Sequence, residues 1–382
     1  MLWPRSRSSS FLSLLSIALL AGCASREPAL DTSQVRPAEA RAFIAKALPA
    51  KTSDRAGWAT DIYAAFATLQ LATTPSNVCA VVGVTEQESG FRADPVVPGL
   101  SAIAWKQIEQ RADSAGVPMF LVRGALQVSS PDGRSYSERI DRAKTERELS
   151  ETFEDFIGMV PMGRRLFSSW NPVATGGAMQ VSIEFAERHA ERRPYPYPMA
   201  AGIRHEVFTR RGGMYFGIAH LLDYPADYDK PLYRFADFNA GHYASRNAAL
   251  QNAISIASGI PLVQDGDLIR RGVGSDQPGQ TETAARVLAA RLGMSHSAVR
   301  RDLEEGDGPD LARTTLYRQV FALAEQTAGR ALPRAVLPQI KLSGPKITRQ
   351  LTTAWFANRV DARYQRCLTR AGRFSSATER VD

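Results

Sequence analysis

The sequence predicts a mainly α-helical fold, and three observations support this prediction. Apolar residues recur at spacings of three and four along most of the chain, which is the period of an amphipathic helix. Strand-like segments are few, and the clearest covers residues 119–128, ending at a Ser-Pro-Asp-Gly turn. The 382 residues are enough for one large domain or two smaller ones.

The first 22 residues have the parts of a bacterial export signal. Arg5 and Arg7 precede an apolar run over residues 11–20, and small residues then lead into Cys23. The apolar run is too short to span a bilayer as a permanent helix. Small residues that run directly into a cysteine resemble a lipobox, which implies cleavage before Cys23 and a lipid on that residue. The alternative is an ordinary secretory signal with an incidental cysteine.

Residues 23–52 are predicted to form a tether between the lipid and the folded domain. They are polar, contain Pro28, Pro37 and Pro49, and show no sustained apolar stripe until late. Ala24, rather than an aspartate, follows the cysteine. By resemblance to lipoprotein sorting in enteric-type bacteria, this favours the outer membrane, with the folded part facing the periplasm.

The chain is basic, with a formal net charge of +8. Removal of the export signal takes away two arginines and leaves a charge of about +6. Such a surface favours contact with acidic polymers and anionic lipid headgroups. Solubility alone is the other explanation, and charge does not decide between them.

The chain has three cysteines. If Cys23 carries a lipid, Cys79 and Cys367 remain in an oxidising compartment. We predict that these two form a disulfide, which ties the C-terminal segment to the helix that bears Glu88. The alternative is a pair of buried free thiols.

Helical patterns follow one another along the chain. They cover residues 55–71, 78–89, 102–112, 137–157, 181–191, 214–222, 243–256, 281–292, 313–326 and 346–368. In the second of these, Ser76 and Asn77 can cap the first turn, and Gly90 follows the last.

Glu88 lies at the end of that second helix. It shares a face with Val84 and Val81, because these residues lie four and seven positions before it. A carboxyl at the wet end of an apolar stripe is partly desolvated, which raises its pKa and keeps a proton available for general acid catalysis. Glu86 is about 200° away around the helix and is expected to face solvent. The plain alternative is a helix-terminal glutamate that straddles core and solvent.

Two later segments complete a pattern that begins with Glu88-Ser89. They are Gly177-Ala178-Met179-Gln180 and Phe238-Asn239-Ala240-Gly241. The ordered set resembles the active site of lytic transglycosylases, the lysozyme-like enzymes that cut the glycan strands of bacterial peptidoglycan. The resemblance implies a lysozyme-like (α+β) catalytic domain over residues 53–260 that needs no cofactor.

The resemblance also implies roles for these residues. Glu88 works alone, first protonating the scissile oxygen and then removing the C6-hydroxyl proton of the muramoyl residue, which leaves a 1,6-anhydromuramoyl end. Ser89 holds the helix end or the carboxylate by a hydrogen bond. The remaining substrate-binding residues line the sugar groove; they are Met179, Gln180, Phe238, Asn239 and Gly241.

Two positions depart from the family pattern. Ala178 stands where leucine is usual, which changes packing. Phe238 stands where the family has tyrosine, so the hydroxyl near the catalytic carboxyl is missing. Asp237 or Tyr243 could supply the polar group instead.

The spacing predicts an insertion within the catalytic domain. Gln180 lies 92 positions after Glu88, a much wider spacing than family members have, so residues 95–170 are interpreted as an inserted helical subdomain. The insertion contains a second motif copy at 124–129, Gly-Ala-Leu-Gln-Val-Ser, but this copy lies in the strand-like stretch, and we prefer the copy at 177–182. Residues 261–382 are expected to form a helical extension packed on the catalytic domain.

Other features of the sequence suggest different functions. Residues 291–301 look like a helix-turn-helix, but an exported protein meets no chromosome, so no nucleic-acid partner is expected. His205-Glu206 begins a zinc motif that Thr209 breaks, and the remaining histidines are scattered, so no metal site is predicted. A non-catalytic peptidoglycan-binding lipoprotein is the main alternative, and a hydrolytic muramidase with the same fold is another.

Overall fold

The computed structural model describes residues 36–193, 195–199, 201–272, 276–342 and 349–378. The predicted export signal (1–22), the lipidation site Cys23 and the first part of the tether lie outside these residues. Helices dominate what is described, so the mainly α-helical prediction is confirmed. No helix in these ranges is long and apolar enough to cross a membrane.

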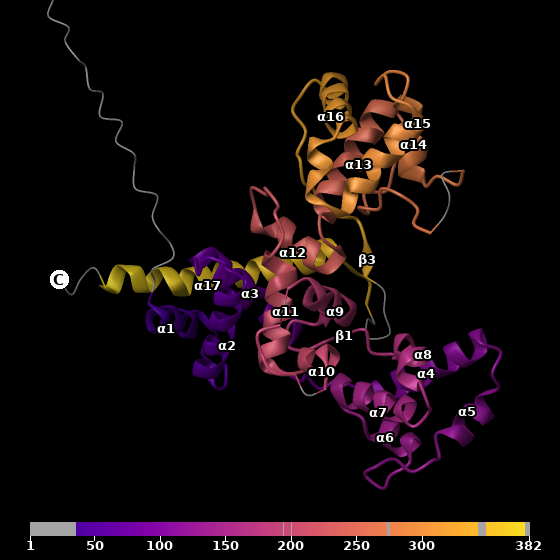
Figure 1. Cartoon of the computed structure of the whole chain (residues 1–382). Helices are drawn as coiled ribbons and strands as arrows, with labels where there is room; N and C mark the ends of the chain where they lie inside the picture. The colour runs from indigo at the N-terminus through magenta and orange to yellow at the C-terminus, as the bar shows by residue number, and fades with distance from the viewer. Residues whose placement is uncertain (1–35, 194, 200, 273–275, 343–348, 379–382) are drawn as a thin grey trace, which may run out of the picture. The chain divides into compact units, whose positions relative to one another are not determined.

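One group of helices, drawn in Figure 1, builds most of the larger hydrophobic core. Its main helices are α1 (Pro37–Ala47), α2 (Arg55–Thr68), α3 (Pro75–Glu88), α9 (Ile183–Arg192), α10 (Ile203–Val207), α11 (Arg210–Leu222), α12 (Pro231–Ala240) and α17 (Thr353–Thr378). The same core also includes residues of the 95–170 segment, among them Leu100, Ile140 and Leu149. The C-terminal helix α17 packs against both α3 and α12. The predicted disulfide is confirmed, since Cys79 of α3 is bonded to Cys367 of α17 with their Cα atoms 5.4 Å apart.

The segment interpreted as an insertion is helical. It contains α4 (Leu100–Ser114), α5 (Met119–Ala125), α6 (Tyr136–Arg142), α7 (Glu146–Gly158), α8 (Gly163–Phe167) and the 3₁₀ turn η2 (Ser168–Trp170). The strand predicted over residues 119–128 is therefore wrong. Met, Leu and Ala favour a helix. A half-buried strand would bury every second residue, whereas the consecutive residues Phe120 and Leu121 are both exposed, 72% and 53%. Residue Ser129 makes only an isolated bridge to Ser135.

The helix predicted over residues 137–157 is two helices. Ser135 caps α6 and Thr145 caps α7, each in a capping box with a glutamate three residues later, Glu138 or Glu148. Both boxes satisfy backbone N–H groups at a helix start, so the chain begins a new helix at Thr145 in place of continuing the first.

A second core is formed by residues between Ala249 and Leu332. Its elements are α13 (Ala244–Ser258), α14 (Gln280–Leu288), α15 (His296–Glu304), η3 (Glu305–Asp307), η4 (Pro309–Arg313) and α16 (Thr315–Ala328). The region 261–382 is thus divided, because its last helix, α17, joins the first core. That helix begins at Thr353 in place of the predicted 346, after the short strands β3 (Lys341–Leu342) and β4 (Leu351–Thr352).

The later part of the predicted tether is also folded. Helix α1 starts with Pro37 in its first turn, where proline suits a helix, and places Ala40, Ile44 and Ala47 in the first core. These residues repeat at spacings of four and three, so one face of the segment is apolar. The segment therefore gains more by packing than by remaining an extended linker.

Candidate active site

A cavity of about 950 Å³ brings the three motifs together. Its lining includes one residue from the first motif, one from the second and all four from the third: Glu88, Gln180, Phe238, Asn239, Ala240 and Gly241. Their helices and turns are far apart in the sequence, so the fold assembles this group.

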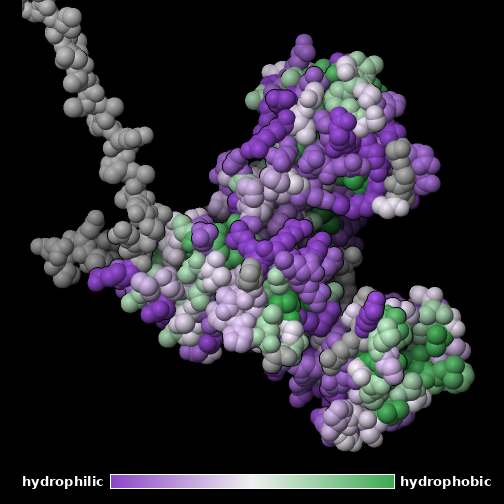
Figure 2. Space-filling model, viewed as in Figure 1, coloured by the Kyte–Doolittle hydropathy of each residue, from purple (hydrophilic) through white to green (hydrophobic). Residues whose placement is uncertain are grey.

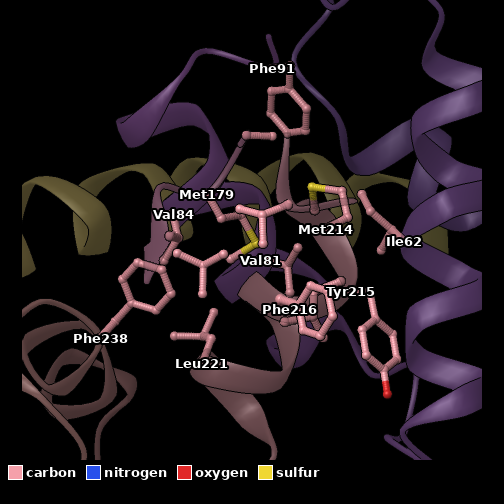
Figure 3. Packing of buried hydrophobic residues seen from close by; sticks show 14 of the residues in the cluster. Ile62, Val81, Val84, Phe91, Met179, Met214, Tyr215, Phe216, Leu221 and Phe238 are labelled. Carbon is pink, nitrogen blue, oxygen red and sulfur yellow. The ribbon is translucent and has the colours of Figure 1, made fainter. Parts of the chain in front are cut away.

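Glu88 is the last residue of α3 and is half-buried at the cavity wall. Thr74 caps the first turn of the helix, and Pro75 occupies its first position. Val81 and Val84, which Figure 3 shows in the core, are fully buried, and helical spacing places them on the same face of α3 as Glu88.

Glu86 does not face open solvent as predicted. Its side chain is largely covered, because α17 packs along this side of α3 and places Arg366 3.8 Å from a Glu86 oxygen. Helical periodicity correctly placed Glu86 on the face of α3 away from Val84, but it could not show that α17 covers that face.

Ser89 follows Glu88 and supports the helix end. It is 3% exposed, and its Oγ donates to the carbonyl of Thr85 at 3.2 Å and accepts from the Arg92 amide at 3.3 Å. Of the two roles expected for it, these bonds match holding the helix end. Ser89 does not line the cavity.

The second motif is the turn of a small hairpin. Strand β1 (Thr175–Gly176) pairs antiparallel with β2 (Val181–Ser182), and residues 177–180 connect them. Gly177 has a φ of +74°, and a Cβ there would lie 2.2 Å from the carbonyl oxygen of Val207, so glycine is required. Gln180 also adopts a left-handed backbone (φ +50°), and its Nε2 donates to the Gly177 carbonyl at 3.3 Å.

Met179 was predicted to line the groove but lies beneath it. Its side chain is fully buried and packs on Gly217 of α11, where even a Cβ would come within 2.5 Å of it. In Figure 3 the Met179 side chain points into the core beside Val81 and Val84. The turn therefore sends Met179 inward as an anchor while Gln180 faces the cavity.

The third motif ends α12, with Gly241 as the C-cap at a φ of +106°. Asn239 is exposed to the cavity, and its Oδ1 accepts from the Thr353 hydroxyl at 3.0 Å, which links this turn to the start of α17. Phe238 is 9% exposed, and its ring packs near Val84. No hydroxyl is presented at position 238.

Asp237 does not replace that hydroxyl. It is fully buried and accepts hydrogen bonds from the hydroxyls of Tyr224 and Tyr228 and from the amides of Tyr243 and Ser245. Burial raises its pKa, and these hydrogen bonds act against that effect. Its task is to join α12 to the start of α13. Of the two substitutes that the sequence suggested, Tyr243 is the one that lines the cavity.

Three histidines, which looked scattered in the sequence, gather around Phe185 in the cavity wall. The ring centroids of His189, His220 and His242 lie 5.7, 4.6 and 5.9 Å from that of Phe185. His220 Nε2 donates to the Phe238 carbonyl at 3.1 Å, and His242 Nε2 donates to the His220 carbonyl at 2.7 Å. No local spacing signals this group, because the helices α9 and α11 and the turn after α12 bring it together.

Burial lowers the pKa of all three histidines, that of His220 to about 3. They are therefore neutral near pH 7 and present a donor and an acceptor each. Within the described ranges no cluster of His, Cys, Asp or Glu is arranged to hold a metal ion.

Charged groups of both signs surround the rest of the cavity. Arg188 and Arg192 project from α9, and Asp223 follows α11, where it pairs with Arg193 at 3.3 Å. The carboxylate of Asp94, six residues after Glu88, pairs with Arg147 at 3.0 Å and does not line the cavity. Amides, neutral imidazoles, aromatic rings and charged groups together suit a polyhydroxyl ligand, which needs both donors and acceptors.

Comparison with known proteins identifies relatives. The profile of the family described as "Protein of unknown function (DUF1615)" matches residues 51–370. The "Uncharacterized protein YaiW" of Escherichia coli (strain K12) is 54% identical over 359 residues, which cover 94% of this chain and 98% of that protein. No solved structure matches the chain.

Proposed function

The chain belongs to the DUF1615 family, and we propose that it is a lytic transglycosylase of lysozyme-like fold that cleaves the MurNAc-GlcNAc β-1,4 bond of peptidoglycan. The observation that supports this most is the convergence of Glu88, Gln180 and Asn239 on one polar cavity. The proposal includes a lipid on Cys23 and attachment to the outer membrane on the periplasmic side.

The chemistry needs one carboxyl that changes role. Protonated Glu88 gives its proton to the glycosidic oxygen as the bond from that oxygen to the muramoyl C1 breaks. The muramoyl C6 oxygen then bonds to C1, and the Glu88 carboxylate takes the proton that this oxygen loses. No water is consumed, and the acid is restored. One carboxyl suffices because the substrate supplies the nucleophile, a recognised exception to the two-carboxylate rule.

Arg363 of α17 assists the first step, in which Glu88 gives up its proton. Burial lowers the pKa of this guanidinium, and the negative charges of Glu86 and Glu88 act against that effect. The same attraction stabilises the Glu88 carboxylate that forms after proton donation. Helix α17, which the disulfide holds on α3, thus contributes to the site without lining the cavity.

The test is mass spectrometry of material released from purified sacculi by a soluble form that starts after Cys23. We expect 1,6-anhydromuramoyl products, and a loss of about 10²–10⁴-fold in Glu88→Gln, the range for removing a general acid. Glu86→Gln is the matched control, since it makes the same chemical change two positions earlier and outside the cavity. Products with reducing ends would instead identify a muramidase.

The alternative is a peptidoglycan-binding lipoprotein without turnover. The observation that favours it is the missing hydroxyl at Phe238, which Asp237 does not replace because the core occupies its oxygens. In that case sacculi would retain both the parent protein and Glu88→Gln in a pull-down, and neither would release fragments.

A further inference from the structure

A second cavity, of about 450 Å³, lies within the 95–170 segment and the residues directly after it. Helices α4, α5, α6 and α7, with the turn η2, form its walls. Its lining residues are Ile108, Arg111, Ala112, Ala115, Val117, Leu121, Val122, Ala125, Leu126, Tyr136, Ile140, Leu149, Thr152, Phe153, Phe156, Trp170 and Pro172. None of them lines the Glu88 cavity, so the two sites are separate.

The walls of this second cavity are almost entirely aliphatic and aromatic, and the apolar surface continues outside it. Of the 15 large hydrophobic residues exposed in the described chain, ten lie between Val96 and Trp170. On the cavity lining, Leu121 is 53% exposed and Trp170 is 49% exposed. Figure 2 shows the same concentration of hydrophobic residues over this part of the chain. Such a concentration marks a binding surface.

Two polar groups in the lining lack the partners expected of them. The Tyr136 ring is fully buried, and in the described part of the chain its hydroxyl has no hydrogen-bond partner. An unpaired buried hydroxyl costs stability unless a ligand pairs with it. The Arg111 guanidinium donates to the Trp170 carbonyl, and no carboxylate among the described residues forms an ion pair with it.

We propose that this cavity binds a single-chain amphiphile with an anionic head, a long-chain fatty acid. The aliphatic chain lies against α4, α5 and α7, Arg111 binds the carboxylate, and Tyr136 supplies a second polar contact. The volume falls within the range of about 300–1,000 Å³ typical of small-molecule sites. A glycan would find too few hydrogen-bonding groups here.

The charges of this segment favour the binding of one anionic head group in the cavity rather than attachment of the whole segment to a charged membrane surface. Residues 95–170 contain ten basic and ten acidic side chains, so the segment has no net charge to draw it to anionic lipid headgroups. Arg111 places one positive charge at an otherwise apolar site, which complements one anionic head on one chain.

The experiment is displacement of the neutral dye N-phenyl-1-naphthylamine from the whole purified protein. Hexadecanoate should displace the dye at a concentration at least tenfold lower than its methyl ester, and Arg111→Gln should abolish that difference. Ala125→Trp, which fills the cavity from α5, should weaken hexadecanoate binding at least tenfold. Phe120→Ala, on the same helix but outside the lining, should change it by less than twofold.

Other outcomes overturn the proposal. If Phe120→Ala weakens dye binding and Ala125→Trp does not, the dye adsorbs to the outer apolar surface, which is then a membrane or protein contact. If sedimentation shows a dimer whose formation excludes the dye, the occupant is a second copy of the chain. Tyr136→Phe gives a check that does not depend on Ala125→Trp folding. It should lower hexadecanoate affinity severalfold without lowering the urea midpoint of unfolding, and unchanged affinity would contradict the assigned contact.

Discussion

The sequence Gly-Ala-Xaa-Gln-Val-Ser occurs twice in the chain, and each copy contributes to a different cavity. The copy at 124–129 ends helix α5, and its alanine and leucine line the apolar cavity. The copy at 177–182 is a hairpin turn, and Gln180 and Ser182 line the polar cavity. Nearly the same six residues thus serve two chemically opposite sites.

The difference comes from what surrounds each copy. The first follows a run of helix-forming apolar residues, so Gly124 continues α5 and an added Cβ would meet nothing within 4 Å. The second follows Gly176, and its own glycine, Gly177, lies against the backbone of Val207. A short motif therefore acquires its function from the backbone that packs on it.

The largest expected difference between the copies concerns their glycines. Gly177→Ala should destabilise the protein by about 3–5 kcal/mol, because it combines a left-handed backbone with a clash against a backbone oxygen. Gly124→Ala should stabilise it by about 0.5–1 kcal/mol, since alanine favours a helix interior. Urea unfolding followed by circular dichroism measures both. Similar destabilisation by the two substitutions would show that the copies do not differ as described.

The disulfide is expected to affect only one of the two cavities. It links α3, which bears Glu88, to α17, and neither of its cysteines lies in the 95–170 segment. Replacing Cys79 and Cys367 with alanine should lower the free energy of unfolding by about 2–4 kcal/mol. Binding of a neutral dye in the apolar cavity should change less than twofold in native buffer. Loss of dye binding together with loss of sacculus digestion would mean that the two cavities are not independent.

The sequence predicted much of this framework. Helical periodicity located α2, α3, α4, α11, α13 and α16 within a few residues, and cysteine counting predicted the disulfide. The preferred motif copy, 177–182, lines the same cavity as Glu88, although residues 119–125 form a helix and not the predicted strand.

What the sequence did not predict depends on contacts between distant elements. Periodicity shows which face of a helix is buried but not what covers it, so Glu86 was assigned to solvent. Met179 was expected at the surface of the groove because nothing local indicates that Gly217 leaves room for it below. The histidine group and the apolar cavity likewise exist only once several helices have packed.

The smallest expected effect is a pH dependence of the free energy of unfolding that comes from the buried histidines. These histidines line the polar cavity and not the apolar one. In the unfolded chain a histidine has a pKa of about 6.5, whereas burial lowers that of His220 to about 3. Between these values the unfolded chain binds the proton and the folded chain does not. Stability that is fully present above pH 6.5 is therefore lost as the pH falls, by about 1–2 kcal/mol between pH 6.5 and pH 5.

Urea unfolding at successive pH values tests this dependence in the parent protein, in His220→Gln and in His296→Gln. The first substitution keeps a donor for the Phe238 carbonyl and should flatten the slope, though not fully, because the pKa of His242 is lowered for the same reason. His296 is exposed on α15 and serves as the control. No histidine lines the apolar cavity, so binding of a neutral dye there should stay constant over the same pH range. A slope that His220→Gln leaves unchanged would mean that this imidazole is solvated in the folded protein, and the cavity wall would then be more open than the structure shows.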